Sequence, residues 1–95
     1  MSITREAIIA NEQGIHCRPS ALIVKEFVSY PGTILLSNGE YSGTVSSVMQ
    51  ILSLELRQGR HVHITVTGPE EEKTADRIKR LLETNFDFPP VDETN

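Results

Sequence analysis

The chain has 95 residues, 38% of them hydrophobic, and a formal net charge of −4 from 9 Lys and Arg against 13 Asp and Glu. This length suits one compact domain, and the negative charge argues against a nucleic-acid partner, because phosphate backbones attract basic surfaces. No apolar run is long enough to cross a bilayer and the N-terminus does not resemble a secretion signal, so we expect no membrane insertion, and the single cysteine fits a cytoplasmic protein.

The first two segments predict a strand followed by a helix. Residues 2–9 alternate between apolar and polar side chains, with a break at Arg5, which is the pattern of a half-buried strand. Residues 20–30 repeat apolar side chains at helical spacing over a broad face, and Pro31 and Gly32 end that helix.

The middle of the chain predicts a hairpin and a short helix. Residues 33–37 and 40–45 flank an Asn-Gly pair, the strongest local signal for a hairpin, so these two segments should be antiparallel neighbours. Residues 47–56 carry apolar side chains at helical spacing. Ser46 or Ser47 can cap the start of the helix, and Gly59 can close its end.

The last third predicts a strand, a helix and a tail. Residues 60–67 alternate cleanly between apolar and polar side chains, which indicates a strand. After Gly68 and Pro69, three glutamates open a helix that turns four apolar side chains inward: Ala75, Ile78, Leu81 and Leu82. The polar, proline-containing residues 85–95 predict a loosely ordered C-terminal tail.

The resulting order of elements, βαββαβα, predicts an α+β fold. Antiparallel strands with one buried face, and helices gathered on that face, form an open-faced β-sandwich: a four-stranded antiparallel sheet with three helices on one face. We expect residues 1–84 to form this single domain, with residues 85–95 as the tail, and we expect a monomer.

The stretch GIHCRPS, residues 14–20, places a histidine and an arginine where the first helix should begin. Pro19 is tolerated only in the first turn of a helix, so His16 lies at its N-terminus. That end attracts anions, and a neutral ring nitrogen of His16 can act as a nucleophile. Arg18 offers a planar fork that matches phosphate oxygens. The pattern predicts that His16 accepts a phosphoryl group and that Arg18 neutralises it.

The histidines and the cysteine also allow interpretations other than a phosphoryl acceptor. His16, at a helix start, can be a solvated cap residue. Cys17 points about 100° away from His16 around a helix, which is a poor arrangement for a nucleophile and its base. His61 and His63 share one face of a strand but have no clear third ligand, so we expect a solvated pair, no metal site and no cofactor.

Four segments together resemble HPr, the histidine-containing phosphocarrier protein of the bacterial phosphoenolpyruvate-dependent sugar phosphotransferase system. They are GIHCRPSA, the Asn-Gly hairpin, SSVMQILSL and QGRHVHITVTGPEEEKTADRI, and the similarity spans roughly residues 2–84. It implies that His16 takes a phosphoryl group from enzyme I and gives it to enzyme IIA domains, with Arg18 beside it. It also implies that a serine kinase or phosphorylase acts on Ser47, with the adjacent Ser46 as the alternative target.

The second helix carries more apolar side chains than one buried stripe requires. Four of them are candidates for a docking patch near His16: Val48, Met49, Ile51 and Leu52. The alternative is that all four belong to the core. Cys17 and Ser20 are further docking candidates.

Three functions remain open from the sequence. The first is a phosphocarrier that feeds sugar uptake. The second is a regulatory protein of the same fold that signals through the phosphorylation of His16 or Ser47. The third is a small metal- or thiol-dependent enzyme, which requires Cys17 and the histidines at positions 16, 61 and 63 to converge.

Overall fold

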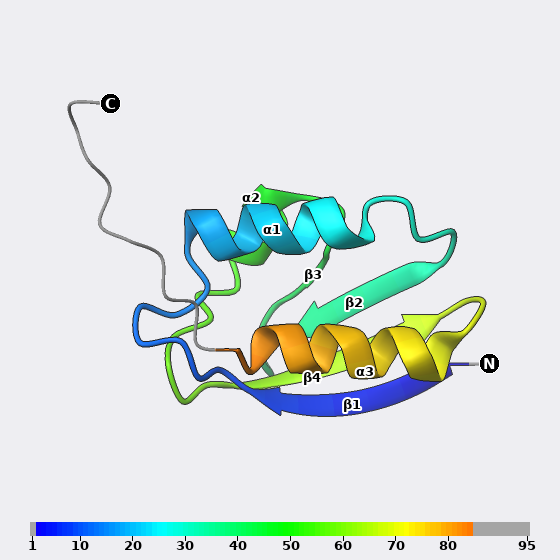
Figure 1. Ribbon diagram of the computed structural model, residues 1–95. Coiled ribbons are helices and arrows are strands. Elements are labelled where there is room, and N and C mark those ends of the chain that lie inside the picture. The colour runs from blue at the N-terminus through cyan, green and yellow to red at the C-terminus, as the bar shows by residue number, and fades with distance from the viewer. Residues whose placement is uncertain (1, 85–95) are drawn as a thin grey trace.

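The computed structural model describes residues 2–84, which form a four-stranded antiparallel sheet and three helices (Figure 1). The predicted tail, residues 85–95, lies outside the described residues. In chain order the elements are β1 Ser2–Ile8, α1 Cys17–Phe27, β2 Thr33–Ser37, β3 Ser42–Thr44, α2 Val48–Leu52, β4 His61–Thr67 and α3 Glu71–Leu82. The order across the sheet is β1-β4-β2-β3. The predicted α+β open-faced sandwich is confirmed.

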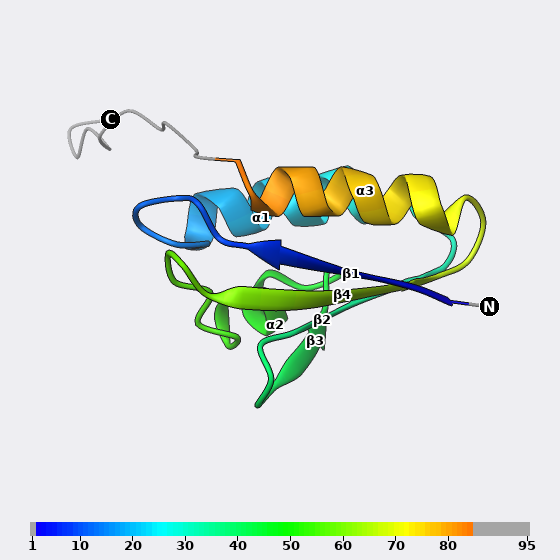
Figure 2. The same cartoon turned by 90° about the horizontal axis from the view of Figure 1, so that it is seen from below.

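The helices are arranged so that the two long ones begin at opposite ends of the domain. α1 and α3 lie on the same side of the sheet and run in opposite directions (Figures 1 and 2). The short α2 packs against α1 and β3. The start of α1 therefore lies at the end of the domain where α3 finishes.

The core lies between the sheet and the helices. Alternate side chains of β4 and β2 are buried, α1 and α3 each contribute a buried stripe, and α2 contributes Ile51. A side chain of this kind contributes about 1.5–3 kcal/mol when fully buried. The fully buried members include Ile23, Leu36, Ile51, Val62, Ile64, Val66, Ile78 and Leu82.

Arg5 breaks the alternation of β1 because it reaches α3. It lies on the same parity of the strand as Ile3 and Ala7, which face the helices. Its Nε donates a hydrogen bond to Asp76 Oδ1 at 3.0 Å. The residue that breaks the pattern of the predicted strand therefore joins β1 to α3.

α1 begins earlier and ends earlier than the predicted segment 20–30. The helix starts at Cys17 and its last residue is Phe27. Tyr30, predicted on the apolar face of the helix, follows the helix instead and donates its hydroxyl hydrogen to Pro69 O at 2.8 Å. That bond ties the end of α1 to the start of α3.

The predicted hairpin is present, with a longer turn than the Asn-Gly pair suggests. β2 ends at Ser37 and β3 begins at Ser42, so four residues connect them. The reason is the side chain of Asn38, whose Oδ1 accepts hydrogen bonds from the main-chain amides of Glu40 and Tyr41, both at 2.8 Å.

α2 is shorter than the predicted segment 47–56. The helix ends at Leu52, and Glu55 adopts a positive φ of 49°, which a continuing helix does not allow. Leu56, the last residue of the predicted segment, is buried but follows the helix. Gly59 does not close the helix, and its amide donates to Ile9 O at 2.8 Å instead.

Each edge strand of the sheet gives one main-chain amide to a helical or post-helical side chain. At the β3 edge, Thr44 N donates to Gln50 Oε1 at 2.8 Å. At the β1 edge, Ile8 N donates to Glu83 Oε2 at 3.2 Å. Both edges are therefore partly covered by side chains.

Candidate functional site

His16 is the N-cap residue of α1. Its backbone is extended, with φ −93° and ψ −161°, and its carbonyl oxygen accepts the first helical hydrogen bond, from Ser20 N at 2.9 Å. The side chain is half-buried and stands at the end of the helix where main-chain amides are not paired within the helix. The predicted location of His16 at a helix N-terminus is therefore confirmed.

The segment that ends at His16, residues 9–16, packs against the segment that connects α2 to β4, residues 53–60. We call these the His16 loop and the α2–β4 loop. Ile15 N donates to Leu56 O at 2.7 Å, and the Ile15 side chain is buried. Gly14 has a φ of 72°, and a Cβ at this position would lie 2.5 Å from Leu56 O. Only glycine fits between the two loops here.

The first turn of α1 carries a cation and no acid. Arg18 is exposed at the second helical position, and no Asp or Glu lies in this turn. Pro19 is the third helical residue and is buried, in agreement with the predicted place of the proline in the first turn. The start of α1 therefore combines a helix pole, a histidine and an arginine, a set that favours a bound anion.

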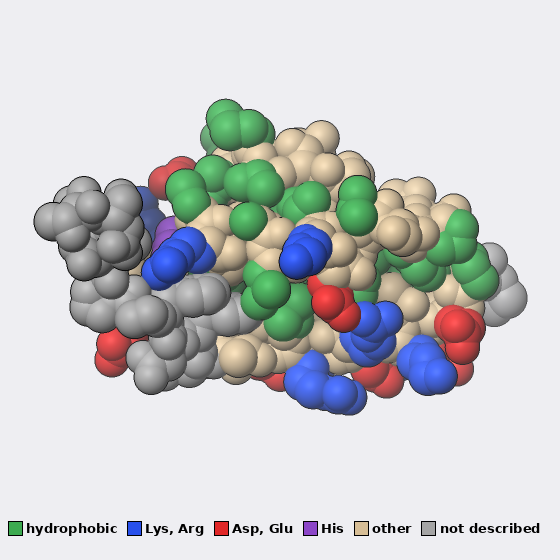
Figure 3. All heavy atoms as spheres, turned by 45° about the horizontal axis from the view of Figure 1, so that its top comes forward, with side chains coloured by type: hydrophobic (Ala, Val, Ile, Leu, Met, Phe, Trp, Pro, Cys, Tyr) green, Lys and Arg blue, Asp and Glu red, His purple; other side chains and the backbone are tan. Residues whose placement is uncertain are grey.

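The docking candidates divide into exposed and buried side chains. Met49 is 74% exposed, Val48 and Leu52 are half-buried, and Cys17 is exposed. Figure 3 shows hydrophobic side chains gathered on the face that carries α1 and α2.

Two of the predicted docking residues are not on the surface. Ile51 is 0% exposed because it fills the core beneath α2, and Ser20 is 0% exposed because it lies on the buried stripe of α1. Neither side chain can be presented to a partner, so the prediction for these two residues is wrong. The alternative that all four apolar residues of α2 are core is also wrong, because Met49 points into solvent.

Ser47 is the N-cap of α2, and its Oγ accepts a hydrogen bond from Gln50 N at 3.3 Å. Ser46 is exposed, and its Oγ lies 2.6 Å from Thr44 Oγ1. The structure thus assigns the cap to Ser47, which the sequence had left open between the two serines.

The other two histidines flank a carboxylate on the open face of the sheet. His61 Nδ1 lies 3.4 Å from Glu6 Oε2, and His63 Nε2 lies 3.8 Å from the same atom. Among residues 2–84, no group of three His, Cys, Asp or Glu side chains is placed to hold a metal ion. The convergence that a metal enzyme built on Cys17 and the three histidines requires is not found in this part of the chain.

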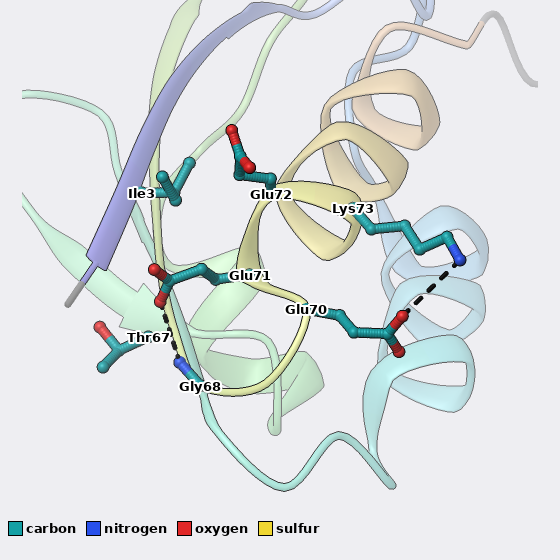
Figure 4. Close-up of a pocket in the computed structure, with 7 residues that line it drawn as sticks. All are labelled: Ile3, Thr67, Gly68, Glu70, Glu71, Glu72 and Lys73. Carbon is teal, nitrogen blue, oxygen red and sulfur yellow. Dashed lines mark hydrogen bonds and ion pairs between the residues drawn. The ribbon is translucent and has the colours of Figure 1, made fainter.

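A hollow of about 1020 Å³ lies at the start of α3, at the other end of the domain from the start of α1 (Figures 1 and 4). Three glutamates and one lysine line it, together with Ile3, Thr67 and Gly68. Glu71 Oε2 accepts a hydrogen bond from Gly68 N at 3.3 Å, and Glu70 lies 3.7 Å from Lys73 Nζ. This predominantly acidic lining repels a phosphate, so the hollow does not suit the predicted chemistry.

The helices of the described residues include none that is long and apolar enough to cross a bilayer.

Comparison with known proteins identifies the class. The family model described as "PTS HPr component phosphorylation site" matches residues 3–84, so the protein is a phosphocarrier domain. The chain belongs to the HPr family of the phosphotransferase system.

Individual relatives agree with this assignment. Phosphocarrier protein NPr of Proteus mirabilis is 32% identical over 88 residues, which cover 92% of this chain and 98% of that protein. A multiphosphoryl transfer protein of Haemophilus influenzae is 31% identical over 82 residues, but the chain spans only 16% of its length. The crystal structure of HPr from Bacillus anthracis superposes with a TM-score of 0.81 at 22% identity, over 86% of this chain and 98% of that one. That likeness concerns the fold.

The sequence did not single out Asn11, which lies in the His16 loop. Its side chain is polar, yet it is only 2% exposed. Its position in a polar stretch before the GIHCRPS motif gives no signal of burial, because Asn is more often exposed in such loops.

Proposed function

We propose that this chain is a cytoplasmic phosphocarrier that accepts a phosphoryl group on His16 from enzyme I and passes it to enzyme IIA domains in sugar uptake. The observation that carries the proposal is the place of His16, at the acid-free N-terminus of α1, in a chain whose family model is named for a phosphorylation site.

The chemistry follows from this position. A ring nitrogen of His16 attacks the phosphorus, the new N–P bond forms as the bond to the donor breaks, and the reverse step with an acceptor returns the histidine. No oxidation or reduction takes place. The helix pole contributes about 0.3–1 kcal/mol to the binding of the anion, and a hydrogen bond from Arg18 contributes about 1.5–3 kcal/mol.

Moderate stabilisation suits a carrier. Each further 1.4 kcal/mol on the phosphorylated state would disfavour transfer onward about tenfold. One arginine and one helix pole at an open surface hold the group without enclosing it. A deep phosphate pocket would hold the group too tightly to release it to an acceptor.

The partners need a surface beside His16, and we assign it to Cys17, Val48, Met49 and Leu52. Cys17 on α1 and Met49 on α2 are exposed, Val48 and Leu52 on α2 are half-buried, and these two helices contact each other. Met49→Ala should raise the KM of enzyme I for this chain while leaving kcat near its original value, because the side chain lies at the surface and carries no reacting atom.

The experiment that tests the carrier function is incubation with phosphoenolpyruvate and enzyme I, followed by mass measurement of the intact chain. One added phosphate that is labile in acid and stable in base is expected, as for a phosphohistidine. A chain that gains no mass, or gains a phosphate that survives acid, contradicts the proposal.

A second candidate is a phosphocarrier that serves regulation or another acceptor in place of sugar uptake. The names of the relatives support this second candidate. NPr proteins match over 98% of their length, and a match at 26% identity is the phosphoryl donor subunit of a dihydroxyacetone kinase. Transfer from the phosphorylated chain to a panel of enzyme IIA domains separates the two. Transfer to no sugar-specific domain would favour the second candidate.

Ser47 is the residue that we propose a serine kinase modifies, with Ser46 as the alternative. A phosphate at position 47 would bring about two negative charges beside Val48 and Met49, and a partner that covers these side chains would have to desolvate them. Ser47→Asp should therefore slow phosphorylation by enzyme I without lowering thermal stability. Ser46→Asp is the matched comparison, and no slowing by either variant would contradict the regulatory role.

A further inference from the structure

The His16 loop contains one buried polar side chain, that of Asn11. It is 2% exposed, and its Nδ2 donates a hydrogen bond to Gly14 O at 2.6 Å. The main chain closes the same turn in the other direction, because Gly14 N donates to Asn11 O at 2.9 Å. Two bonds therefore link residue 11 to residue 14, two positions before His16.

These two bonds belong to a wider contact between the His16 loop and the α2–β4 loop. Across it, Ile9 N donates to Arg60 O at 3.0 Å and Gln58 Nε2 donates to Ala10 O at 3.3 Å. On the other side of Asn11, Ile15 N donates to Leu56 O at 2.7 Å. The two ends of the His16 loop are thus fixed to the neighbouring loop, and the Asn11 side chain sets the shape of the turn between them.

The buried apolar side chains of the loop hold only its two ends. Ile9 and Ile15 are 1% and 4% exposed and hold the two ends in the core. Residues 10, 12 and 13 between them are exposed. Asn11 is consequently the one side chain of residues 10–13 that is buried and able to hold the turn.

We infer that Asn11 is a positioning residue for phosphoryl transfer: its carboxamide fixes Gly14, and through Gly14 and Ile15 the direction of His16 at the start of α1. This inference rests on the proposed function of His16. Transfer requires the nucleophile to stay aligned with the incoming phosphorus, and a displacement of about 1 Å can reduce a rate about a hundredfold. Asn11 touches neither the phosphoryl group nor the partner.

Asn11→Asp is the sharpest variant, because it keeps the size of the side chain and removes its N–H donor. A carboxylate oxygen would then face Gly14 O, and the turn would shift to separate the two acceptors. Asn11→Ala is the second variant. It removes the donor without adding a charge, and it serves if the Asp variant does not fold.

Asn38 provides a matched control. Its Nδ2 also donates to a loop carbonyl, Leu54 O, at 2.7 Å. Asn38→Asp removes that donor while keeping an oxygen for the amides of Glu40 and Tyr41. The two asparagines therefore carry the same chemistry, but only Asn11 lies in the His16 loop.

The experiment compares phosphorylation by enzyme I at a temperature where all variants are folded. For Asn11→Asp we expect kcat to fall about ten- to a hundredfold with little change in the KM for the chain, and the main-chain NMR shifts of residues 15–18 to move. Asn38→Asp should lose thermal stability and keep its kcat.

Three results would overturn the inference: an unchanged kcat in both folded Asn11 variants, an equal loss of kcat in Asn38→Asp, or unmoved NMR shifts at residues 15–18. Failure of the proposed function looks different, because then the unmodified chain accepts no phosphate. In that case the NMR comparison still tests whether Asn11 fixes the main chain at residues 15–18.

Discussion

The two long helices of this domain start in opposite ways. α3 opens with acids: Glu71 and Glu72 lie in its first turn, and Glu71 also accepts a hydrogen bond from Gly68 N. The first turn of α1 has no acid and carries Arg18 behind His16. A helix N-terminus carries roughly half a positive charge. The carboxylates of α3 neutralise that charge, whereas the first turn of α1 contains no carboxylate to do so.

A helix N-terminus thus serves stability at one end of the domain, at α3, and in our proposal serves phosphoryl transfer at the other end, at α1. The two ends are far apart, since the helices run in opposite directions on the same side of the sheet (Figures 1 and 2). Substitutions at the two helix starts should therefore separate transfer from stability.

The largest effect is expected for His16→Ala, which should abolish the acid-labile phosphate because the nucleophilic ring is lost. Glu71→Gln, at the start of α3, should lose a little stability and keep the phosphate. Intact-mass measurement after incubation with enzyme I and phosphoenolpyruvate checks both variants. A label that persists in His16→Ala, on His61 or His63, would show that the acceptor is misassigned.

Arg18→Ala should leave phosphorylation possible but slow. Losing a charge-assisted hydrogen bond costs about 1.5–3 kcal/mol, which corresponds to roughly ten- to a hundredfold in rate. Single-turnover transfer from phosphorylated enzyme I measures this directly. Rates equal to those of the unmodified chain would remove Arg18 from the mechanism.

Cys17→Asp would make the start of α1 resemble the start of α3. An acid at the first helical position should leave the helix as stable or more stable, by about 0.3–1 kcal/mol. It should also slow phosphorylation about tenfold, because the carboxylate repels the phosphoryl group across a short distance. Cys17→Asn is the matched control for size. Equal rates for the Asp and Asn variants would mean that the charge at this pole does not matter.

The smallest effect is expected at the end of α3, where Glu83 lies beside Lys79. The pKa of Glu83 is lowered from 4.5, first because Lys79 donates a side-chain hydrogen bond to the carboxylate and second because Ile8 N donates to it. A lowered pKa in the folded state adds stability above 4.5 that is lost as the pH falls through the folded-state value.

Glu83→Gln should therefore be less stable than the unmodified chain at pH 7, by about 0.3–0.5 kcal/mol for an exposed pair of this kind. The difference should shrink to nothing well below pH 4.5, which denaturant unfolding at several pH values can measure. Phosphorylation of His16 should not change. A stability difference that is constant with pH would contradict the assignment to this carboxylate.

The sequence predicted the elements and the His16–Arg18 pair because both depend on local patterns. Alternation in residues 60–67 and the place of Pro19 are read from neighbours along the chain. Two errors came from contacts between distant segments, because Ile51 and Ser20 are buried by elements that the sequence does not place beside them. The error in the length of α2 is local, since Glu55 adopts a positive φ.

Asn11 is the clearest case of information that only the fold contains. Its burial depends on the approach of the His16 loop to Leu56 and Arg60, residues more than forty positions away. A polar loop residue becomes a buried donor only when that approach is made. Periodicity and motif spacing describe neighbours along the chain and do not predict such a contact.

The hydrogen bonds at the two edges of the sheet bear on whether another chain can add a strand there. An uncovered edge strand can recruit a strand from another molecule and start an aggregate. β3 is only three residues long and gives an amide to Gln50, and β1 gives one to Glu83. Under the proposed function, a carrier meets many partners in turn and must leave each one. By occupying these amides itself, the domain removes places where a visiting chain could lengthen the sheet and stay attached.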